Sequence, residues 1–167
     1  GYWLESMNIL GITLARGGSK SVPLKNIKNL KGKPLIVYTI EEALKSNFIT
    51  DYIVSTDSNK IKEVAEKAGA EVPFIRPKKL STDKASSVDA LKHAVKFMER
   101  RKKVSYDLII ELMCTNPLKN VQDIDACINK MISTEADSVI AVHELDDHHP
   151  ARIKKIVQDK IRDFAVK

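Results

Sequence analysis

The sequence is poor in cysteine and in long apolar runs, and each shortage excludes a class of protein. The two cysteines, Cys114 and Cys127, have neither metal-ligand spacing nor a secretory context, which predicts reduced, partly buried thiols. No apolar run approaches the roughly 18–20 residues that span a bilayer. Glu5 and Asn8 interrupt the N-terminal stretch, which also lacks the basic start of a secretory signal. We therefore expect a cytoplasmic protein without a membrane segment.

Aromatic residues are also scarce, at 5% of the chain, although the formal charge is +6. A positive charge favours anionic partners such as nucleotides, acidic sugars or nucleic acid. Binding of single strands usually needs aromatic side chains that stack on bases. The densest basic cluster, residues 100–103, ends a predicted helix, where cations complement the helix dipole. These features favour small anionic ligands, with nucleic-acid binding as a disfavoured alternative.

What the chain does contain is an alternation of short apolar segments and amphipathic segments. The apolar runs predict strands at 8–14, 51–55, 71–75, 107–113 and 137–142. Helical periodicity and capping residues predict helices at 34–46, 59–68, 86–102 and from Asp123 to about Ile132. After Pro150 the sequence predicts one or two short strands with a turn near Asp159. The pattern indicates an α/β fold with a mostly parallel sheet that helices cover on both faces.

The length of 167 residues fits one domain with a substantial core. Residues 1–6 lie ahead of Met7 and look unrelated to the rest of the chain, so we expect them to be a remnant outside the domain. Residues 7–167 then form a single domain, and we see no repeats or linkers within it.

The most informative segment is residues 15–26, ARGGSKSVPLKN, directly after the first expected strand. Phosphate sites in open α/β sheets lie at this place. Gly17 and Gly18 would let the backbone take positive φ values and approach a phosphate closely. Polar groups suited to phosphate come from Arg16, Ser19, Lys20 and Lys25. The segment matches neither the P-loop nor the dinucleotide fingerprint, and a solvated surface turn is the alternative interpretation.

Residues 15–26 resemble the N-terminal signature of the CMP-sialic acid synthetases (acylneuraminate cytidylyltransferases), A-R-x-x-S-K-G-x-P-x-K-N. Six further strings follow in that family's order and are similar to its motifs. They are Gly32-Lys33-Pro34-Leu35, Val54-Ser55-Thr56-Asp57, Phe74-Ile75-Arg76-Pro77, the segment 81–87 (STDKASS), Thr115-Asn116-Pro117-Leu118 and His148-His149-Pro150. Together the motifs cover residues 15–150, nearly the whole chain.

The resemblance implies one nucleotide-diphospho-sugar transferase-like (Rossmann-like) domain in a homodimer. CTP would bind over the first loop, and the anomeric hydroxyl of an acidic 2-keto sugar would attack its α-phosphorus. Pyrophosphate would leave, and a CMP-sugar would form. The resemblance also implies Mg²⁺, but its ligands cannot be identified in this chain.

The resemblance also implies roles for individual residues. Arg16 and Lys25 would hold the triphosphate and stabilise the departing pyrophosphate, as catalytic residues. Nucleotide contacts are implied for Ala15, Arg16, Gly17, Gly18, Ser19, Lys20, Asn26, Asp57, Arg76, Asp83, Ser86 and Ser87. Sugar contacts are implied for Thr115, Asn116, His148 and His149.

Several of these residues have a simpler alternative interpretation. Ser86 and Ser87 could only cap a helix, and Asp83 could only form a turn. Asp57 is better placed to cap a helix than to bind a metal ion. The two histidines of the 148–150 motif could be solvent-exposed.

The sequence departs from the family pattern at three places. Ser21 stands where the family has glycine, which predicts a shifted or less rigid loop if that position needs positive φ. Met113 and Cys114 replace a Gln-Pro pair, and methionine cannot donate hydrogen bonds to the polar tail of sialic acid. This favours other acidic nonulosonates or related 2-keto sugars. The family also continues beyond Lys167, so the alternative function is CTP binding without complete catalysis.

Overall fold

In the computed structural model, residues 7–18, 24–114, 120–133, 151–157 and 160–163 are described. They form a five-stranded sheet with the strand order β4-β1-β5-β6-β7. Its strands are β1 (Ile9–Leu14), β4 (Asp51–Ser55), β5 (Leu108–Leu112), β6 (Ala151–Val157) and β7 (Lys160–Asp163). A second, two-stranded sheet is the short hairpin of β2 (Asn29–Leu30) and β3 (Lys33–Pro34).

The centre of the large sheet is parallel, as the sequence predicts. β1 pairs in parallel with β4 on one side and with β5 on the other. The hairpin β6–β7 then extends the sheet beyond β5 with antiparallel pairing, so the sheet is mixed at this edge. The tail strands after Pro150 are thereby confirmed, and the α/β class is confirmed with them.

The strand expected at 71–75 is wrong. This segment makes only two isolated bridges, Ile53 with Glu71 and Thr56 with Ile75. Pro73 lies between them and has no N–H to donate to a ladder, which explains why continuous pairing with β4 fails. The strand expected at 137–142 lies outside the described residues.

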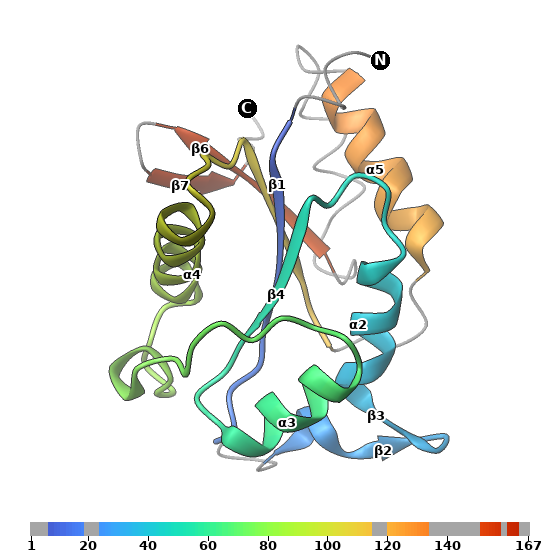
Figure 1. Cartoon of the computed structure of the whole chain (residues 1–167), viewed down its shortest axis with the longest axis vertical. Coiled ribbons are helices and arrows are strands. Elements are labelled where there is room, and N and C mark those ends of the chain that lie inside the picture. Colours follow the sequence, from blue (N-terminus) through green and yellow to red (C-terminus); the bar gives the residue numbers. More distant parts are fainter. Residues whose placement is uncertain (1–6, 19–23, 115–119, 134–150, 158–159, 164–167) are drawn as a thin grey trace.

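Helices cover both faces of the parallel strands (Figure 1). On one face lie α2 (Leu35–Leu44), α3 (Asn59–Lys67) and α5 (Val121–Ser133). Ile36, Ile40, Ile61 and Ile128 of these helices pack in one buried cluster with the strands. On the other face lies α4 (Ser87–Lys102), with Leu91, Ala94, Val95 and Met98 buried against Leu10, Ile12 and Ile109. No helix of the described part is long and apolar enough to cross a membrane.

Helix boundaries follow the expected capping residues with two corrections. Ser58 caps α3 by accepting a hydrogen bond from the Ile61 N–H, and Gly69 follows that helix with φ of 100°. The side chain of Asp57, an expected cap, bonds elsewhere. Asn120, not Asp123, caps α5, because its side-chain oxygen accepts the Asp123 N–H at 2.9 Å.

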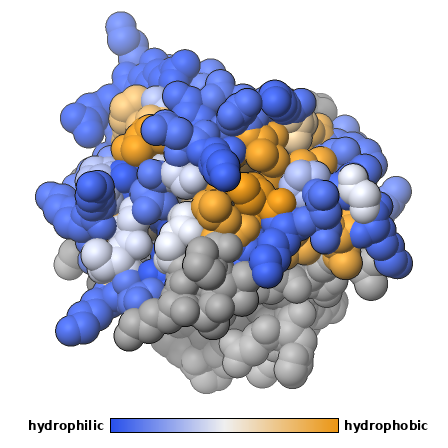
Figure 2. Space-filling model, turned by 90° about the horizontal axis from the view of Figure 1, so that it is seen from below, coloured by the Kyte–Doolittle hydropathy of each residue, from blue (hydrophilic) through white to orange (hydrophobic). Residues whose placement is uncertain are grey.

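Two 3₁₀ turns complete the chain around the carboxyl ends of the parallel strands, η1 (Lys25–Ile27) and η2 (Lys78–Leu80). With α3 and the hairpin β2–β3 they form the lower end of the molecule in Figure 1. Seen from this end, hydrophobic residues gather in the middle of the surface and hydrophilic residues surround much of them (Figure 2).

Candidate functional site

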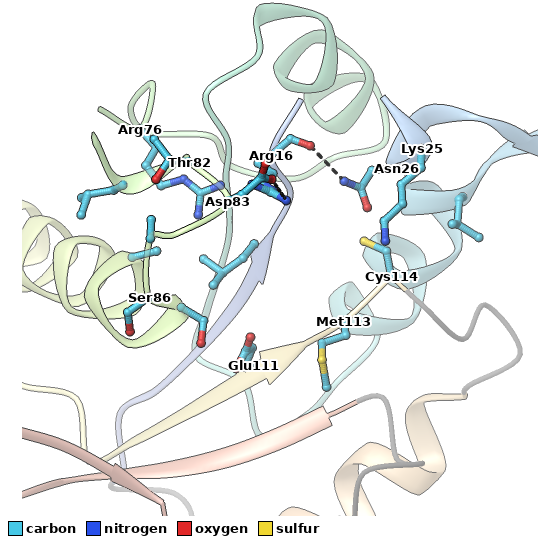
Figure 3. A pocket seen from close by; sticks show the side chains of 16 residues that line it. Arg16, Lys25, Asn26, Arg76, Thr82, Asp83, Ser86, Glu111, Met113 and Cys114 are labelled. Atoms are coloured by element: carbon cyan, nitrogen blue, oxygen red, sulfur yellow. Dashed lines mark hydrogen bonds and ion pairs between the residues drawn. The ribbon is translucent and has the colours of Figure 1, made fainter. Parts of the chain in front are cut away.

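A cavity of about 580 Å³ opens at the carboxyl ends of β1 and β5, beside the N-terminus of α4 (Figure 3). Open α/β sheets bind their ligands at this edge. The lining combines cations, hydroxyl groups, two carboxylates and apolar side chains. It is formed by Leu14, Arg16, Lys25, Asn26, Leu35, Arg76, Leu80, Thr82, Asp83, Ala85, Ser86, Ser87, Ala90, Glu111, Met113 and Cys114.

Two hydrogen bonds hold Gly17, at the start of the loop after β1. The Gly17 N–H donates to Asp57 Oδ1 at 2.8 Å, and the Leu24 N–H donates to the Gly17 carbonyl at 2.9 Å. A carboxylate at the end of β4 therefore holds the start of the loop, across forty residues of sequence. This explains Asp57, for which the sequence suggested helix capping.

The expected positive φ values at Gly17 and Gly18 are absent, which corrects the sequence prediction. Gly17 is needed for a different reason. A Cβ atom at this position would lie 2.9 Å from the Ser58 Cβ, closer than real Cβ atoms approach. At Gly18 a Cβ would meet no atom of the described residues within 4 Å. Close approach of two backbone segments therefore explains Gly17, and no contact with the described part of the chain explains Gly18.

Arg16 and Asp83 meet across the cavity rim as an ion pair, with 2.6 Å between Nη2 and Oδ1. Their side chains are 31% and 37% exposed, so an entering anion can reach the guanidinium. Exposed pairs of this kind contribute little to stability. Asp83 is thus more than a turn former: it positions Arg16 and offsets its charge.

Asn26 and Lys25 lie on the opposite side of the loop, in η1 (Figure 3). Asn26 is buried, and its side-chain amide donates to the Arg16 carbonyl at 3.4 Å. Lys25 is exposed and lines the cavity. The two residues bring a donor group and a cation to the cavity from the far end of the loop.

Arg76 is the buried cation of the site, with 4% of its surface exposed. Its backbone N–H donates to the Thr56 carbonyl at 2.8 Å, and its Nε donates to Ser81 Oγ at 3.2 Å. Burial lowers the pKa of the guanidinium; nearby Asp57 raises it, and nearby Arg16 lowers it. Arginine still keeps its charge under such conditions. A buried guanidinium that lines a cavity can bind an anion or a carbonyl oxygen.

The N-terminus of α4 contributes Ser86 and Ser87 to the cavity wall. Ser86 accepts the Val88 N–H at 3.1 Å and is therefore also the helix cap. Capping and lining the cavity are thus not alternatives at this position.

Three residues at the end of β5 line the cavity although sequence reasoning did not assign them to the nucleotide. They are Glu111, Met113 and Cys114. Burial raises the pKa of the Cys114 thiol to about 12, while a hydrogen bond with Thr39 and the charge of Lys25 act in the opposite direction. Glu111 is a carboxylate with only 5% of its surface exposed. One acidic residue within an apolar strand was the signal that could have found it.

The other expected site residues divide into two groups. Ala15 is fully buried, and neither it nor Gly17, Gly18 and Asp57 is part of the cavity lining. The remaining expected residues lie outside the described residues: Ser19, Lys20, Thr115, Asn116, His148 and His149.

Within the described ranges, no group of three or more His, Cys, Asp or Glu side chains could hold a metal ion. The two carboxylates of the cavity lining are Asp83 and Glu111, and Asp83 is paired with Arg16. These residues do not form a metal site by themselves.

The protein is thus of the α/β class, with a cation-rich cavity at the carboxyl ends of parallel strands, the edge at which such folds bind ligands. The sequence profile of the family described as cytidylyltransferase matches residues 10–158. The chain belongs to this cytidylyltransferase family.

Two curated relatives illustrate the similarity. The chain is 40% identical over 140 residues to the pseudaminic acid cytidylyltransferase of Campylobacter jejuni. The aligned residues make up 84% of this chain and 60% of that protein. It is 38% identical over 118 residues to the CMP-N,N'-diacetyllegionaminic acid synthase of Legionella pneumophila, covering 71% of this chain and 50% of that protein. The chain thus spans half to three-fifths of the length of these relatives.

Among solved structures, a CMP:2-keto-3-deoxy-manno-octonic acid synthetase complexed with CTP shares the fold with a TM-score of 0.63. The match covers 77% of this chain and 49% of that one, at 23% identity. At this identity the similarity concerns the fold alone.

Proposed function

We propose that this chain binds CTP and serves an enzyme that transfers CMP to the anomeric hydroxyl of an acidic 2-keto sugar, with release of pyrophosphate. One observation carries the proposal. Arg16, Lys25 and Arg76 converge on a single cavity at the carboxyl ends of β1 and β5. Membership of the cytidylyltransferase family supports the choice of nucleotide.

The triphosphate would lie beside the loop after β1. Arg16 and Lys25 would neutralise the charge that collects on pyrophosphate as it leaves, which is the main electrostatic demand of this chemistry. The loop residues Ser19 and Lys20 would add phosphate contacts. The wall that includes Arg76, Ser86 and Ser87 would then face the nucleoside.

The sugar remains the least constrained substrate. Met113 stands where a glutamine would bind the polar tail of sialic acid, and its thioether offers no donor. The relatives named for pseudaminic and diacetyllegionaminic acid support a nonulosonate of that kind. Thr115, Asn116, His148 and His149 would contact it.

We also propose that Mg²⁺ arrives with the triphosphate. Mg²⁺ commonly keeps several waters and binds through one or two carboxylates together with substrate phosphates. No described residue is assigned to it, and the roles of the side chains above do not depend on it. A homodimer in the cytoplasm completes the proposal.

Thermal unfolding of the purified chain with Mg²⁺ and each of CTP, UTP, ATP and GTP tests the nucleotide. A ligand that binds only the folded state adds about 2.7 kcal/mol at a hundredfold excess over Kd. Stabilisation by CTP in preference to the other three is the expected result. Equal stabilisation by all four, or by none, would contradict the proposal.

Binding without turnover is the alternative function that a second measurement separates. Pyrophosphate release is followed with CTP and nonulosonates of the pseudaminic and legionaminic type. Release that depends on the sugar supports the transferase. CTP binding without release supports a binding module.

A further inference from the structure

We propose that Glu111 is the residue that selects cytosine, by accepting a hydrogen bond from the 4-amino group of the base. This inference rests on the proposed function, because it takes the bound nucleotide to be CTP. It concerns a side chain that no sequence motif singles out, next to the last residue of the strand sequence LIIEL.

The position of Glu111 fits a role in ligand recognition. β5 alternates its side chains, and Leu108, Ile110 and Leu112 pack in the cluster with α2, α3 and α5. Glu111 therefore faces the other side, which α4 covers. It is buried, and Figure 3 shows its carboxylate pointing from β5 into the cavity.

The difference between cytosine and uracil determines which groups can discriminate between them. Cytosine presents a donor, its 4-amino group, where uracil presents a carbonyl acceptor. A carboxylate accepts from that amino group and repels the carbonyl. A group that can both donate and accept adapts to either base and selects neither.

Among the polar side chains of the lining, the carboxylates meet this requirement. Arg16, Lys25 and Arg76 can only donate, which would favour the uracil carbonyl. The hydroxyl groups and the Asn26 amide can do both. The acceptor-only side chains of the lining are Asp83 and Glu111. Asp83 lies with Arg16 on the cationic side of the cavity, so Glu111 is the acceptor that is placed to contact the base.

The charge distribution supports the same orientation of the nucleotide. A buried carboxylate next to a triphosphate would be repelled by it. In Figure 3, Arg16 and Lys25, the two cations proposed to hold the triphosphate, lie across the cavity from Glu111. The phosphates are attracted to the cations, and the uncharged nucleoside faces the carboxylate.

The test is the ratio of affinities for CTP and UTP, measured by calorimetry on the wild-type chain and on Glu111→Gln. A glutamine amide can rotate to donate to the uracil carbonyl, so we expect the CTP preference to fall by about tenfold or more. CTP and UTP carry the same triphosphate, so the loss of one negative charge changes both affinities alike and cancels in their ratio. Glu111→Leu, which cannot accept, is a second variant with the same expected loss.

Two controls separate contact with the base from a general charge effect and from contact with the ribose. Glu99→Gln makes the same change of charge at a glutamate outside the cavity, where it accepts the Tyr106 N–H, and should keep the wild-type ratio. The ratio of CTP to 2′-deoxyCTP should be equal in wild type and Glu111→Gln. A change in that ratio instead would place Glu111 at the ribose and overturn the proposal.

The binding results for wild type and Glu111→Gln distinguish failure of the Glu111 role from failure of the proposed CTP-binding function. If wild type prefers CTP and Glu111→Gln keeps that preference, the inference fails and the proposed function stands. If wild type binds neither CTP nor UTP, the proposed function fails and the inference falls with it. A purely structural glutamate would change the unfolding free energy and leave the ratio as it is.

Discussion

Gly17 lies where the segment after β1 approaches the backbone that follows β4. Its N–H reaches the Asp57 carboxylate, and its Cα hydrogen occupies the space in front of Ser58. No side chain fits there, and the hydrogen bond requires the same close approach. The shape of the loop therefore depends on this position.

Gly17→Ala should destabilise the chain by about 1–3 kcal/mol, because the added methyl group forces the loop and Ser58 apart. CTP affinity should fall with it, since the loop moves. Urea unfolding and calorimetric binding measure the two effects. Gly18→Ala is the matched control, with open space around its Cβ, and should change both quantities little. Equal effects of the two variants would contradict a special role for Gly17.

Asp83 pairs with Arg16, so we expect it to compete with a bound phosphate for the guanidinium. Asp83→Asn should therefore increase the affinity for inorganic pyrophosphate several-fold, most clearly at low salt. Stability should change by less than about 1 kcal/mol, because the pair is about one-third exposed. Titration with pyrophosphate at two salt concentrations measures the first effect. Glu41→Gln, which breaks the distant Lys33–Glu41 pair, is the control. An unchanged or lower affinity in Asp83→Asn would count against competition.

At the scale of elements, α5 is fastened to α2 by side chains that accept backbone hydrogen bonds. Asp125 accepts the Asn47 N–H at 3.1 Å and bonds the Ser46 hydroxyl at 2.5 Å. Glu42 accepts the Val121 N–H at 2.8 Å. These contacts link the two helices on the same face of the sheet. Residues of both helices pack there in one buried cluster with Cys114.

Asp125→Ala should lower the free energy of unfolding by about 1–3 kcal/mol, since two donors lose their partner. Denaturant unfolding monitored by circular dichroism measures it. Asp123→Ala removes an exposed acid from the same first turns and should cost less than about 1 kcal/mol. A larger effect at Asp123 than at Asp125 would show that helix electrostatics outweigh the link between the helices.

The elements were predictable where one physical signal dominated. β1, β4 and β5 are buried apolar runs, and α2, α3 and α4 have apolar stripes with recognisable ends. The strand at 71–75 was predicted from apolar content, but the missing N–H of Pro73 outweighed it. Asp57 precedes a helix as a cap would, and only the folded loop shows its carboxylate at Gly17.

The site was predictable in part. Arg16, Lys25, Asn26, Arg76, Asp83, Ser86 and Ser87 follow from motifs and line one cavity. Glu111 stands out in the sequence as an acidic residue within an apolar strand, but its place in the cavity depends on how the distant segments pack around the end of β5.

At the scale of the whole molecule, stability should depend on the protonation of His93. Burial lowers its pKa, and the charges of Arg76, Arg100 and Lys79 lower it further. Its ring also packs against Phe74, with 4.6 Å between centroids. The folded state therefore binds a proton less readily than the unfolded state, whose histidine titrates near 6.5.

Stability should consequently fall as pH decreases through the region below about 6.5, and this contribution is fully present above it. Unfolding free energies between pH 5 and 8 test the sign. In His93→Gln the slope over this range should be smaller than in wild type. Equal slopes would assign the dependence to other groups.

The contact of Gly17 with Asp57 also bears on how the protein is made. During synthesis, Gly17 leaves the ribosome forty residues before its partner Asp57. The partner of Arg16, Asp83, is translated later still. The loop cannot hold this shape until β4 has been translated and has joined β1. A nascent chain shorter than this would lack the proposed nucleotide site, so we expect that capture of a nascent chain by immobilised CTP would report how far its sheet has been completed.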